Sequence, residues 1–167
     1  MTLTELTADT HTVAYKRFFL TGLHRHRACF RISPADEANE PFPTRGTADS
    51  FTLGLLTDAG ELAGVVSFQR EGQTREKLRH KGLLFRMCVS ADYAGQGLGR
   101  RLVGEVIRRV REQTDIEQIN LTVVATNAPA KRLYESLGFH SFALERRAIK
   151  DGDTYYDEEQ MVLFLDE

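Results

Sequence analysis

The sequence predicts an α/β fold, a single domain with a mixed β-sheet flanked by helices. Three observations predict it. The chain has 167 residues, of which 41% are hydrophobic, and a domain of that size buries roughly 70% of its unfolded surface, enough for one core without disulfide or metal staples. Segments with strand periodicity alternate with amphipathic helical segments. A glycine-rich segment joins a strand to a long helix. We therefore expect one α/β domain over residues 1–167.

The first half of the chain predicts an initial strand, a helix and a hairpin. Tyr15, Phe19 and Leu23 recur every four residues, which places them on one helical face. Three of the four prolines then fall in one irregular stretch, which is typical of a loop with at most a short helix. The expected elements are a helix over 8–26, this loop over 32–50, and strands over 51–56 and 61–70 around a turn at 57–60.

The second half predicts a strand, two helices and three further strands. Leu98, Leu102, Val106 and Val110 recur every four residues, while arginines occupy the opposite side of the same segment, so this helix is amphipathic. The sheet is expected to be parallel where that helix crosses between two strands. The expected elements are strand 83–89, the glycine-rich segment 93–99, a helix from 98, strand 118–125, helix 127–137, and strands 139–150 and 154–165 joined at 151–153.

Charge and cysteine content exclude several classes of protein. Lys and Arg number 22 against 24 Asp and Glu, a net charge of -2, whereas a general nucleic-acid binder shows a basic excess. Cys29 and Cys88 lack CxxC spacing, so we expect no disulfide framework and no metal, and a reducing compartment. Neither a leader nor an 18-residue apolar window is evident, so we expect a cytoplasmic protein without a membrane partner.

The glycine-rich segment predicts a local anion site. Gly95, Gly97 and Gly99 allow successive backbone amides to turn toward one point, and the helix start adds partial positive charge. A phosphate or pyrophosphate suits such a site. The dinucleotide fingerprint fails because Arg100 and Leu102 stand where a third glycine is required, and no Walker A lysine follows. A flexible turn before a helix is the alternative interpretation.

A second motif begins at Asn127 and reads N-A-P-A-K-R-L-Y-E-S-L-G-F. Asn127 suits a helix cap, Pro129 suits the first turn, and Tyr134 lies two turns later on nearly the same face. The alternative is that Asn127 is only a cap and Tyr134 only a half-buried aromatic residue.

Together, three segments resemble the GNAT superfamily of acyl-CoA-dependent N-acyltransferases: the strand F-R-M-C-V at 85–89, the run A-D-Y-A-G-Q-G-L-G-R at 91–100, and the block at 127–139. The specific match spans 83–139, and the flanks 77–82 and 155–163 are more loosely similar to bacterial members. The resemblance implies a GNAT-like fold, whose largely antiparallel sheet is splayed at a central parallel strand pair. It also implies acetyl-CoA as the acetyl donor.

The resemblance assigns roles to individual residues. Backbone amides of the glycine segment would cradle the CoA pyrophosphate, the strand before it would pair with the pantetheine, and an asparagine and a tyrosine would contact the pantetheine and the sulfur. The implied cofactor-binding residues are Met87, Cys88, Val89, Gly95, Gln96, Gly97, Leu98, Gly99, Arg100, Asn127, Lys131 and Tyr134. A solvated helix face is the alternative for Lys131. Ala94 departs from the family, which commonly has Arg or Gln there, so one side-chain contact is missing unless Arg100 or Arg101 replaces it.

The implied catalytic groups are the Val89 N–H and the Tyr134 hydroxyl. The Val89 amide is the candidate oxyanion donor, and Tyr134 is the general acid that faces the sulfur. With a thiol pKa of about 8.5 and a tyrosine pKa of about 10, full proton transfer costs about 2 kcal/mol. We therefore expect Tyr134 to act mainly as a hydrogen-bond donor to the developing thiolate.

The general base is left open by the sequence. The strand 83–88 carries no carboxylate, so a water relay or a residue from a neighbouring segment must serve. Glu71 and His80 are candidates, and the alternative is that both are solvated ends of a charged loop. Cys88 has no evident histidine partner, so we interpret it as strand packing and not as a nucleophile.

The acceptor is expected opposite CoA, between the first helical region and the loop that joins the last two strands. Acidic and aromatic residues in those segments would suit a cationic amine. They are Phe30, Phe42, Asp36, Glu37, Glu40, Tyr155, Tyr156, Asp157 and Glu158. We expect direct acetyl transfer to a primary amine of a small molecule or peptide. The alternatives are an acyl-CoA-binding or sensing module, and a binding protein for another phosphate ligand. A homodimer through an exposed edge strand at Met161–Leu165 is compatible with the sequence.

Overall fold

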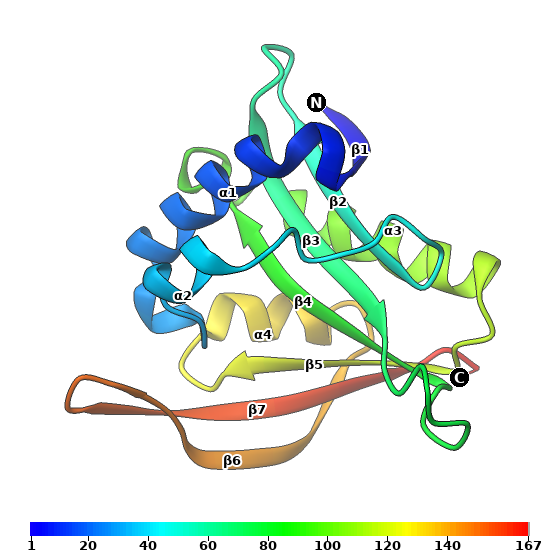
Figure 1. Cartoon of the computed structure of the whole chain (residues 1–167). Coiled ribbons are helices and arrows are strands. Elements are labelled where there is room, and N and C mark those ends of the chain that lie inside the picture. The colour runs from blue at the N-terminus through cyan, green and yellow to red at the C-terminus, as the bar shows by residue number, and fades with distance from the viewer. Residues whose placement is uncertain (167) are drawn as a thin grey trace.

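One mixed sheet organises the computed structural model, which describes residues 1–166 (Figure 1). Its strand order is β1-β2-β3-β4-β5-β7-β6, and only the β4–β5 pair is parallel. The predicted fold class is therefore confirmed. The elements are β1 Thr2–Leu6, α1 Ala8–Arg25, η1 Arg27–Cys29, α2 Pro34–Asn39, β2 Ser50–Leu56, β3 Leu62–Arg70, β4 Lys81–Val89, η2 Ala91–Tyr93, α3 Leu98–Gln113, β5 Gln118–Val124, α4 Ala128–Glu135, β6 His140–Asp151 and β7 Thr154–Phe164.

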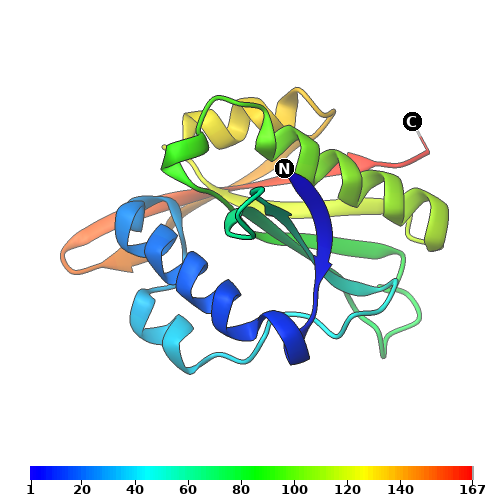
Figure 2. The ribbon, with the colours of Figure 1, turned by 90° about the horizontal axis from the view of Figure 1, so that it is seen from above.

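Helices cover both faces of the sheet (Figure 2). On one face, Tyr15, Phe19 and Leu23 of α1 are buried against Val65 and Cys88 of the central strands, which confirms the predicted helical stripe. On the other face, α3 and α4 pack over the strands. The α3 residues buried there are Leu98, Leu102, Val103, Val106, Ile107 and Val110. Each face of the sheet therefore has its own apolar core.

The predicted loop over 32–50 does contain one short helix. Ser33 and Asp36 form a capping box at the start of α2: the Asp36 N–H donates to Ser33 Oγ at 3.1 Å, and the Ser33 N–H donates to Asp36 Oδ2 at 3.2 Å. The sequence S-P-A-D encodes this start, because proline suits the first helical turn. This helix holds Glu37 over the sheet.

The parallel strands β4 and β5 pair over three residues and then separate. Their register pairs Lys81 with Gln118, Gly82 with Ile119 and Leu83 with Asn120. Figure 1 shows the two strands starting side by side and ending apart. We call the separated parts, 84–89 of β4 and 121–124 of β5, the split. The predicted splay at the parallel pair is thus confirmed.

A bulge bends β4 within the split. Its register with β3 shifts between Val65 and Ser67, and Arg86 has a φ of 52°, in the left-handed region. A bulge of this kind increases the local twist and redirects the strand. The bulge therefore helps to turn the end of β4 away from β5.

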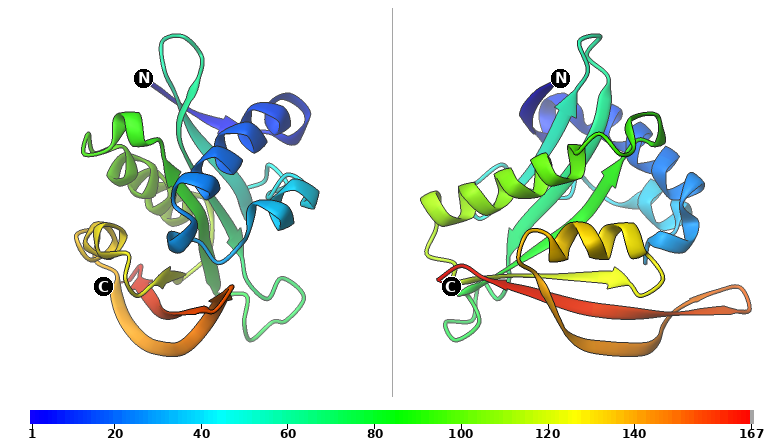
Figure 3. Two further views of the ribbon diagram at one scale, coloured as in Figure 1. Left: turned by 90° about the vertical axis from the view of Figure 1, so that its left-hand side faces the viewer. Right: turned by 180° about the vertical axis from the view of Figure 1, so that it is seen from behind.

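The prediction that Met161–Leu165 forms an exposed edge strand is wrong. Because the chain turns back at Gly152 (φ 60°) after β6, β7 lies between β5 and β6 and is paired on both sides. The segment Met161–Leu165 is therefore not an exposed edge. The edge belongs to β6, where Phe142 and Leu144 are 53% and 55% exposed, and the β6–β7 hairpin projects from the body of the domain (Figure 3).

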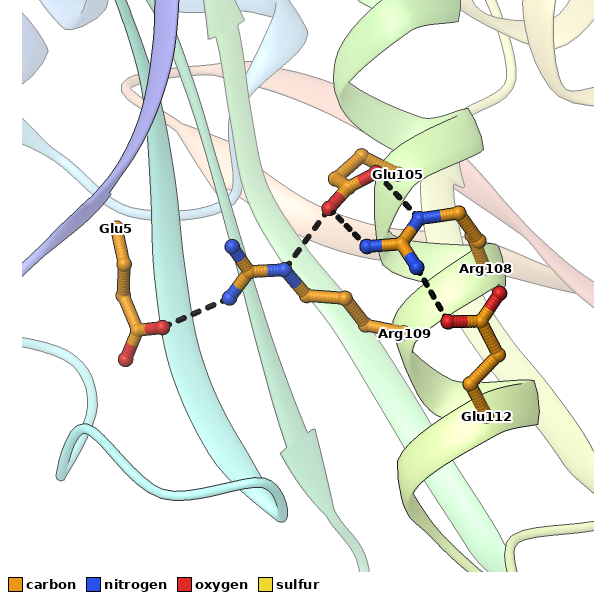
Figure 4. Close-up of polar contacts among 5 residues, drawn as sticks. All are labelled: Glu5, Glu105, Arg108, Arg109 and Glu112. Atoms are coloured by element: carbon orange, nitrogen blue, oxygen red, sulfur yellow. Dashed lines mark hydrogen bonds and ion pairs between the residues drawn. The ribbon is translucent and has the colours of Figure 1, made fainter.

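Two arginines on the polar side of α3, Arg108 and Arg109, form ion pairs within the protein (Figure 4). Arg109 donates to Glu105 at 3.0 Å and to Glu5 of β1 at 2.7 Å. Arg108 pairs with Glu105 at 2.8 Å and with Glu112. Hydrogen bonds from Arg108 and Arg109 lower the pKa of Glu105 to about 2. This arginine-rich side is thus a network of ion pairs that ties α3 to β1. No helix within residues 1–166 is both long and apolar enough to span a membrane.

Candidate active site

The glycine-rich segment forms an exposed, amide-lined start to α3. Gly95 and Gly97 each have a φ of 76°, and an added Cβ at either would meet no atom within 4 Å. Their role is therefore conformational, because L residues are strained at such angles. The Arg101 N–H is the first donor within the helix, to the Gly97 carbonyl at 3.1 Å, so the amides at 98–100 have no acceptor inside the helix. These amides and the helix dipole suit a phosphate.

Gly99 brings this amide cradle close to β4 and α4. A Cβ on Gly99 would lie 2.8 Å from Leu133 Cδ2 and 2.9 Å from Met87 Cε. A larger residue there would have to displace the ends of these two side chains. The start of α3 therefore sits directly beside the end of the split, and the geometry fits a phosphorylated ligand such as acetyl-CoA, with its phosphates at the cradle.

The Val89 N–H points toward the split. Ser90 donates its N–H to the Ala63 carbonyl of β3 at 2.9 Å. In antiparallel pairing, residues that exchange hydrogen bonds alternate with residues whose N–H and C=O point away, so Val89, opposite Gly64, directs its amide away from β3. A cavity of about 330 Å³ between α1, the β2–β3 turn and the end of β4 is lined by other parts of Val89. The role of the Val89 N–H as oxyanion donor stays a prediction.

Tyr134 is held on α4 in an apolar setting. It is 6% exposed, and its ring meets Phe139 edge-on at a centroid distance of 5.8 Å. Burial alone raises its pKa well above the ordinary value of 10. Full proton transfer to a thiolate is therefore even less favourable than the ordinary pKa values of the two groups imply, and the geometry favours Tyr134 as a hydrogen-bond donor that stays protonated.

Asn127 caps α4 and stands just beyond the end of β5. Its Oδ1 accepts a hydrogen bond from the Ala130 N–H at 3.3 Å. The capping interpretation is thus confirmed for the side-chain oxygen. The Nδ2 amide group is the part of Asn127 that a pantetheine carbonyl would use.

The side chains of Lys131 and Arg100 have partners within the protein. Lys131 pairs with Glu159 of β7 at 2.5 Å, and Arg100 donates to Ser136 Oγ at the end of α4 at 2.8 Å. The Arg100 side chain therefore ties α3 to α4, and its backbone N–H is the group left for a phosphate. A phosphate-binding role for Lys131 would have to share it with Glu159, and it stays a prediction.

Cys88 is a packing residue. It is 5% exposed, and a Cβ on Gly22 of α1 would lie 2.5 Å from its Sγ. Burial raises the pKa of its thiol to about 12, so the thiolate that a nucleophile needs is scarce at neutral pH. Among residues 1–166, no three His, Cys, Asp or Glu side chains gather as a metal site would require.

The structure removes Glu71 and His80 as candidates for the general base. The Glu71 N–H donates to the Lys81 carbonyl, and the His80 carbonyl accepts from Glu117, so both residues lie at the start of β4. Eight residue steps at 3.3 Å separate Lys81 from Val89, about 26 Å along the strand. Both residues therefore lie at the opposite end of β4 from Val89, the candidate oxyanion donor. The sequence does not reveal this separation, because it depends on the direction in which β4 runs from these two residues.

The aromatic residues predicted for the acceptor side divide between core and surface. Phe30 meets Phe19 edge-on at 5.6 Å, and Phe42 meets Tyr15 at 5.3 Å, so both belong to the α1 core. Tyr155 is 46% exposed on the hairpin, where the Arg147 guanidinium lies 4.9 Å from its ring centroid. Tyr156 is half-buried on the same strand. Phe30 and Phe42 therefore pack beneath the predicted acceptor side, and Tyr155 lies on the surface of the hairpin.

The five predicted carboxylates of that side also divide. Asp36 caps α2, Asp157 accepts a hydrogen bond from the Arg147 N–H at 2.8 Å, and Glu40 is exposed. Glu37 and Glu158 are instead buried, at 0% and 2% exposure. Buried carboxylates are rare unless they have a partner or a function, so these two are the residues to explain.

Glu37 is bound by an arginine from the β4 bulge. Arg86 donates to Glu37 Oε2 and lies 3.4 Å from the Tyr15 hydroxyl, and its guanidinium stacks over Phe19 at 5.4 Å. Burial raises the pKa of Glu37, while Arg86 acts in the opposite direction. This pair is not predicted from the sequence. The available signal was an arginine inside the apolar strand F-R-M-C-V, because a buried charge requires a partner.

Glu158 has a looser partner. Its Oε2 lies 3.4 Å from Arg31 Nη2, and the Arg31 side chain is 65% exposed. Burial raises the pKa of Glu158, Arg31 lowers it, and Glu145 raises it further. From the sequence, Glu158 is predicted for the acceptor side together with its acidic neighbours, because a run of charged residues does not show which of them is buried.

Comparisons with known proteins agree with this geometry. The acetyltransferase (GNAT) family model matches residues 19–139. The [Ribosomal protein bS18]-alanine N-acetyltransferase of Escherichia coli K12 is 43% identical over 63 residues, 38% of this chain and 42% of that protein. The N-alpha-acetyltransferase of Sulfurisphaera tokodaii is 30% identical over 76 residues, 46% of each chain. The chain thus spans less than half the length of these curated relatives.

A solved structure shows the same fold over the whole domain. It is a Salmonella typhimurium protein solved with its cofactor acetyl-CoA, with a TM-score of 0.80 and 21% identity, covering 100% of this chain and 95% of that one.

Proposed function

This chain belongs to the acetyltransferase (GNAT) family, and from that premise we propose that it transfers the acetyl group of acetyl-CoA to a primary amine of a small molecule or peptide, by direct transfer in a ternary complex. The split carries this proposal. It opens one edge of β4, turns the Val89 N–H into the opening, and ends beside the amide cradle at the start of α3.

Each group of the site then has a defined task. Acetyl-CoA supplies an acetyl group activated as a thioester. The amides at 98–100 hold its phosphates, and the Asn127 amide group holds the pantetheine. The Val89 N–H stabilises negative charge on the carbonyl oxygen. Tyr134 donates a hydrogen bond to the sulfur as its charge develops, without giving up its proton.

The acceptor face favours a cationic amine. Two buried carboxylates, Glu37 and Glu158, lie on the side of the sheet covered by α1 and α2. The two curated relatives described above are named for acetylation of a ribosomal protein alanine and of an N-alpha position. Peptides with a free amino terminus are therefore the first acceptors to test. A homodimer and a cytoplasmic location stay predictions that this proposal does not use.

An acceptor panel tests the proposal. The purified protein is mixed with acetyl-CoA and, separately, with amidated peptides that begin with alanine or serine, with amino acid amides, and with alkylamines. We expect CoA thiol release and a matching acetyl mass shift for at least one amine. The alternative function, an acyl-CoA-binding or sensing module, predicts acetyl-CoA binding by calorimetry without thiol release above background hydrolysis. That outcome would contradict the proposed activity.

A further inference from the structure

Glu158 faces the acceptor side of the sheet. Successive side chains of a strand point to opposite faces. Met161 is buried in the core under α3, and Glu159 pairs with Lys131 of α4, so the odd-numbered residues of β7 face those helices. Glu158 therefore faces the other side, and its ion pair with Arg31, which follows η1, agrees with this direction.

Glu158 also lies at the open end of the split. It is opposite Val124, the last residue of β5, and the Ala125 N–H still donates to the Asp157 carbonyl at 2.9 Å. Because β4 and β5 are parallel, their carboxyl ends lie at the same edge of the sheet. Glu158 is thus on the same edge as Val89, the candidate oxyanion donor.

One oxygen of Glu158 accepts no hydrogen bond. It is the buried Oε2, which lies 3.4 Å from Arg31 Nη2 in the ion pair but accepts no hydrogen bond from any residue between 1 and 166. A buried acceptor left without a donor is costly and rare in native proteins. The atom therefore points to a donor that arrives with a ligand, and a protonated amine is a donor of the right charge.

Glu37 also has an oxygen without a donor, Oε1, but its partner distinguishes it from Glu158. The Arg86 side chain that binds Glu37 is only 14% exposed and also contacts the Tyr15 hydroxyl and the Phe19 ring. The Arg31 side chain beside Glu158 is 65% exposed and forms a longer ion pair, at 3.4 Å. Glu158 is therefore the less firmly paired of the two buried carboxylates.

We propose that Glu158 is the catalytic base that takes a proton from the acceptor amine, an inference that rests on the proposed acetyltransferase function. The ammonium group transfers one proton to the Glu158 carboxylate, and the neutral nitrogen attacks the thioester carbon. The C–N bond forms, the C–S bond breaks, and the sulfur leaves with its electron pair. The second proton lost by the amine ends on the CoA thiol, and Glu158 returns its proton to solvent.

The charges around Glu158 suit this role. Burial raises the pKa of Glu158 from its ordinary value of 4.5, and Glu145, opposite it on β6, raises the pKa further. Arg31 acts in the opposite direction. A carboxylate shifted toward neutral pH accepts a proton from an amine better than an ordinary glutamate. Glu159 and Lys131 pair on the other face and do not oppose this balance.

The first test is Glu158→Gln, which keeps the shape and removes the base. With an acceptor from the panel at saturating concentration, we expect kcat to fall about 100-fold or more, with the KM for acetyl-CoA unchanged and the acidic limb of the kcat–pH profile lost. A melting curve at pH 7 shows whether the variant is folded. A kcat within threefold of the wild type, with the limb retained, would overturn the assignment.

The second test uses the two charges that face Glu158. Arg31→Gln removes a positive neighbour, so the acidic limb of kcat should move to higher pH. Glu145→Gln removes a negative neighbour, so the same limb should move to lower pH. If Glu158 had only a structural role, the two variants would not shift the acidic limb in opposite directions. Shifts in the same direction, or no shift in either variant, would contradict Glu158 as the base.

A binding measurement separates this inference from the proposed activity. Titration of an amidated peptide that begins with alanine into the protein at pH 8, followed by calorimetry, should show at least tenfold weaker binding to Glu158→Gln and unchanged binding to Glu145→Gln. If the wild type binds the peptide tenfold more tightly than Glu158→Gln does but releases no CoA, the transferase activity fails and the amine contact stands. If CoA is released and Glu158→Gln binds and reacts as the wild type does, the activity stands and Glu158 fails.

Discussion

The two faces of the sheet at the split are built in different ways. Toward α3 and α4, the groups offered to a ligand are backbone amides and a buried hydroxyl, from Val89, the glycine segment and Tyr134. Toward α1 and α2, they are two buried carboxylates with arginine partners. The first side depends on local backbone conformation. The second depends on partners that only the complete fold brings together, so the two sides should fail differently when mutated.

The largest expected effect is on the acceptor side. Glu37→Ala leaves Arg86 buried without its carboxylate, and removal of one member of a buried ion pair typically costs about 3–5 kcal/mol. We expect the free energy of unfolding, from urea titration at pH 7, to fall by that amount. Glu40→Ala is the matched control, because this exposed residue of the same segment should change stability by less than about 0.5 kcal/mol. Equal losses in both variants would remove the distinction between Glu37 and an ordinary surface carboxylate.

The donor side should lose activity without losing stability. Tyr134→Phe removes a hydrogen bond to developing negative charge, worth about 1.5–3 kcal/mol, so kcat should fall roughly 10- to 100-fold. Binding of acetyl-CoA by calorimetry should change little, because the phosphates are held elsewhere. Unaltered turnover would exclude Tyr134 from the mechanism.

Backbone conformation is the next feature to test. Gly97→Ala places a Cβ at a φ of 76°, which costs about 1–2 kcal/mol, and we expect both a lower free energy of unfolding and weaker acetyl-CoA binding. Gly104→Ala in the same helix is the control, because its Cβ meets open space and should stabilise the helix by about 0.5–1 kcal/mol. If both variants were stabilised, the glycine segment would not require its left-handed conformation.

The smallest effect has a definite sign. Because the pKa of Glu158 is raised in the folded state, the folded protein holds this proton more tightly than the unfolded chain does. The resulting stabilisation is complete below the unfolded pKa and is lost as the pH rises through the folded pKa. From pH 4 to pH 8, urea titrations should therefore show the wild type losing stability relative to Glu158→Gln. The opposite trend would mean that the folded state favours the charged carboxylate.

The same contrast explains what the sequence predicts well. The strands, the helices and the donor side follow from local patterns: the fourfold spacing of α3, the alternate glycines, and the Asn127 to Tyr134 interval. Each pattern lies within about one element, so periodicity and turn chemistry are sufficient to identify it.

The acceptor side could not be predicted in this way. Glu37 and Arg86 are 49 positions apart, and Arg31 meets Glu158 only because β7 lies beside β5. No local pattern shows that β7 lies between β5 and β6 in the sheet. For that reason the prediction of an exposed edge at Met161–Leu165 was wrong. The base candidates Glu71 and His80 failed for a related reason, since the direction of β4 decides which end of the strand meets the ligand.

The inner position of β7 also sets the order in which the protein can be completed during synthesis. Strands β1 to β4 pair with their neighbours in chain order, so they are able to assemble as they leave the ribosome. β5 must wait with one edge unpaired until β7 has followed β6 out of the exit tunnel. The donor side, which ends at Phe139, therefore leaves the ribosome before Glu158 does, and its core is closed only when Met161 and Leu163 of β7 have joined it.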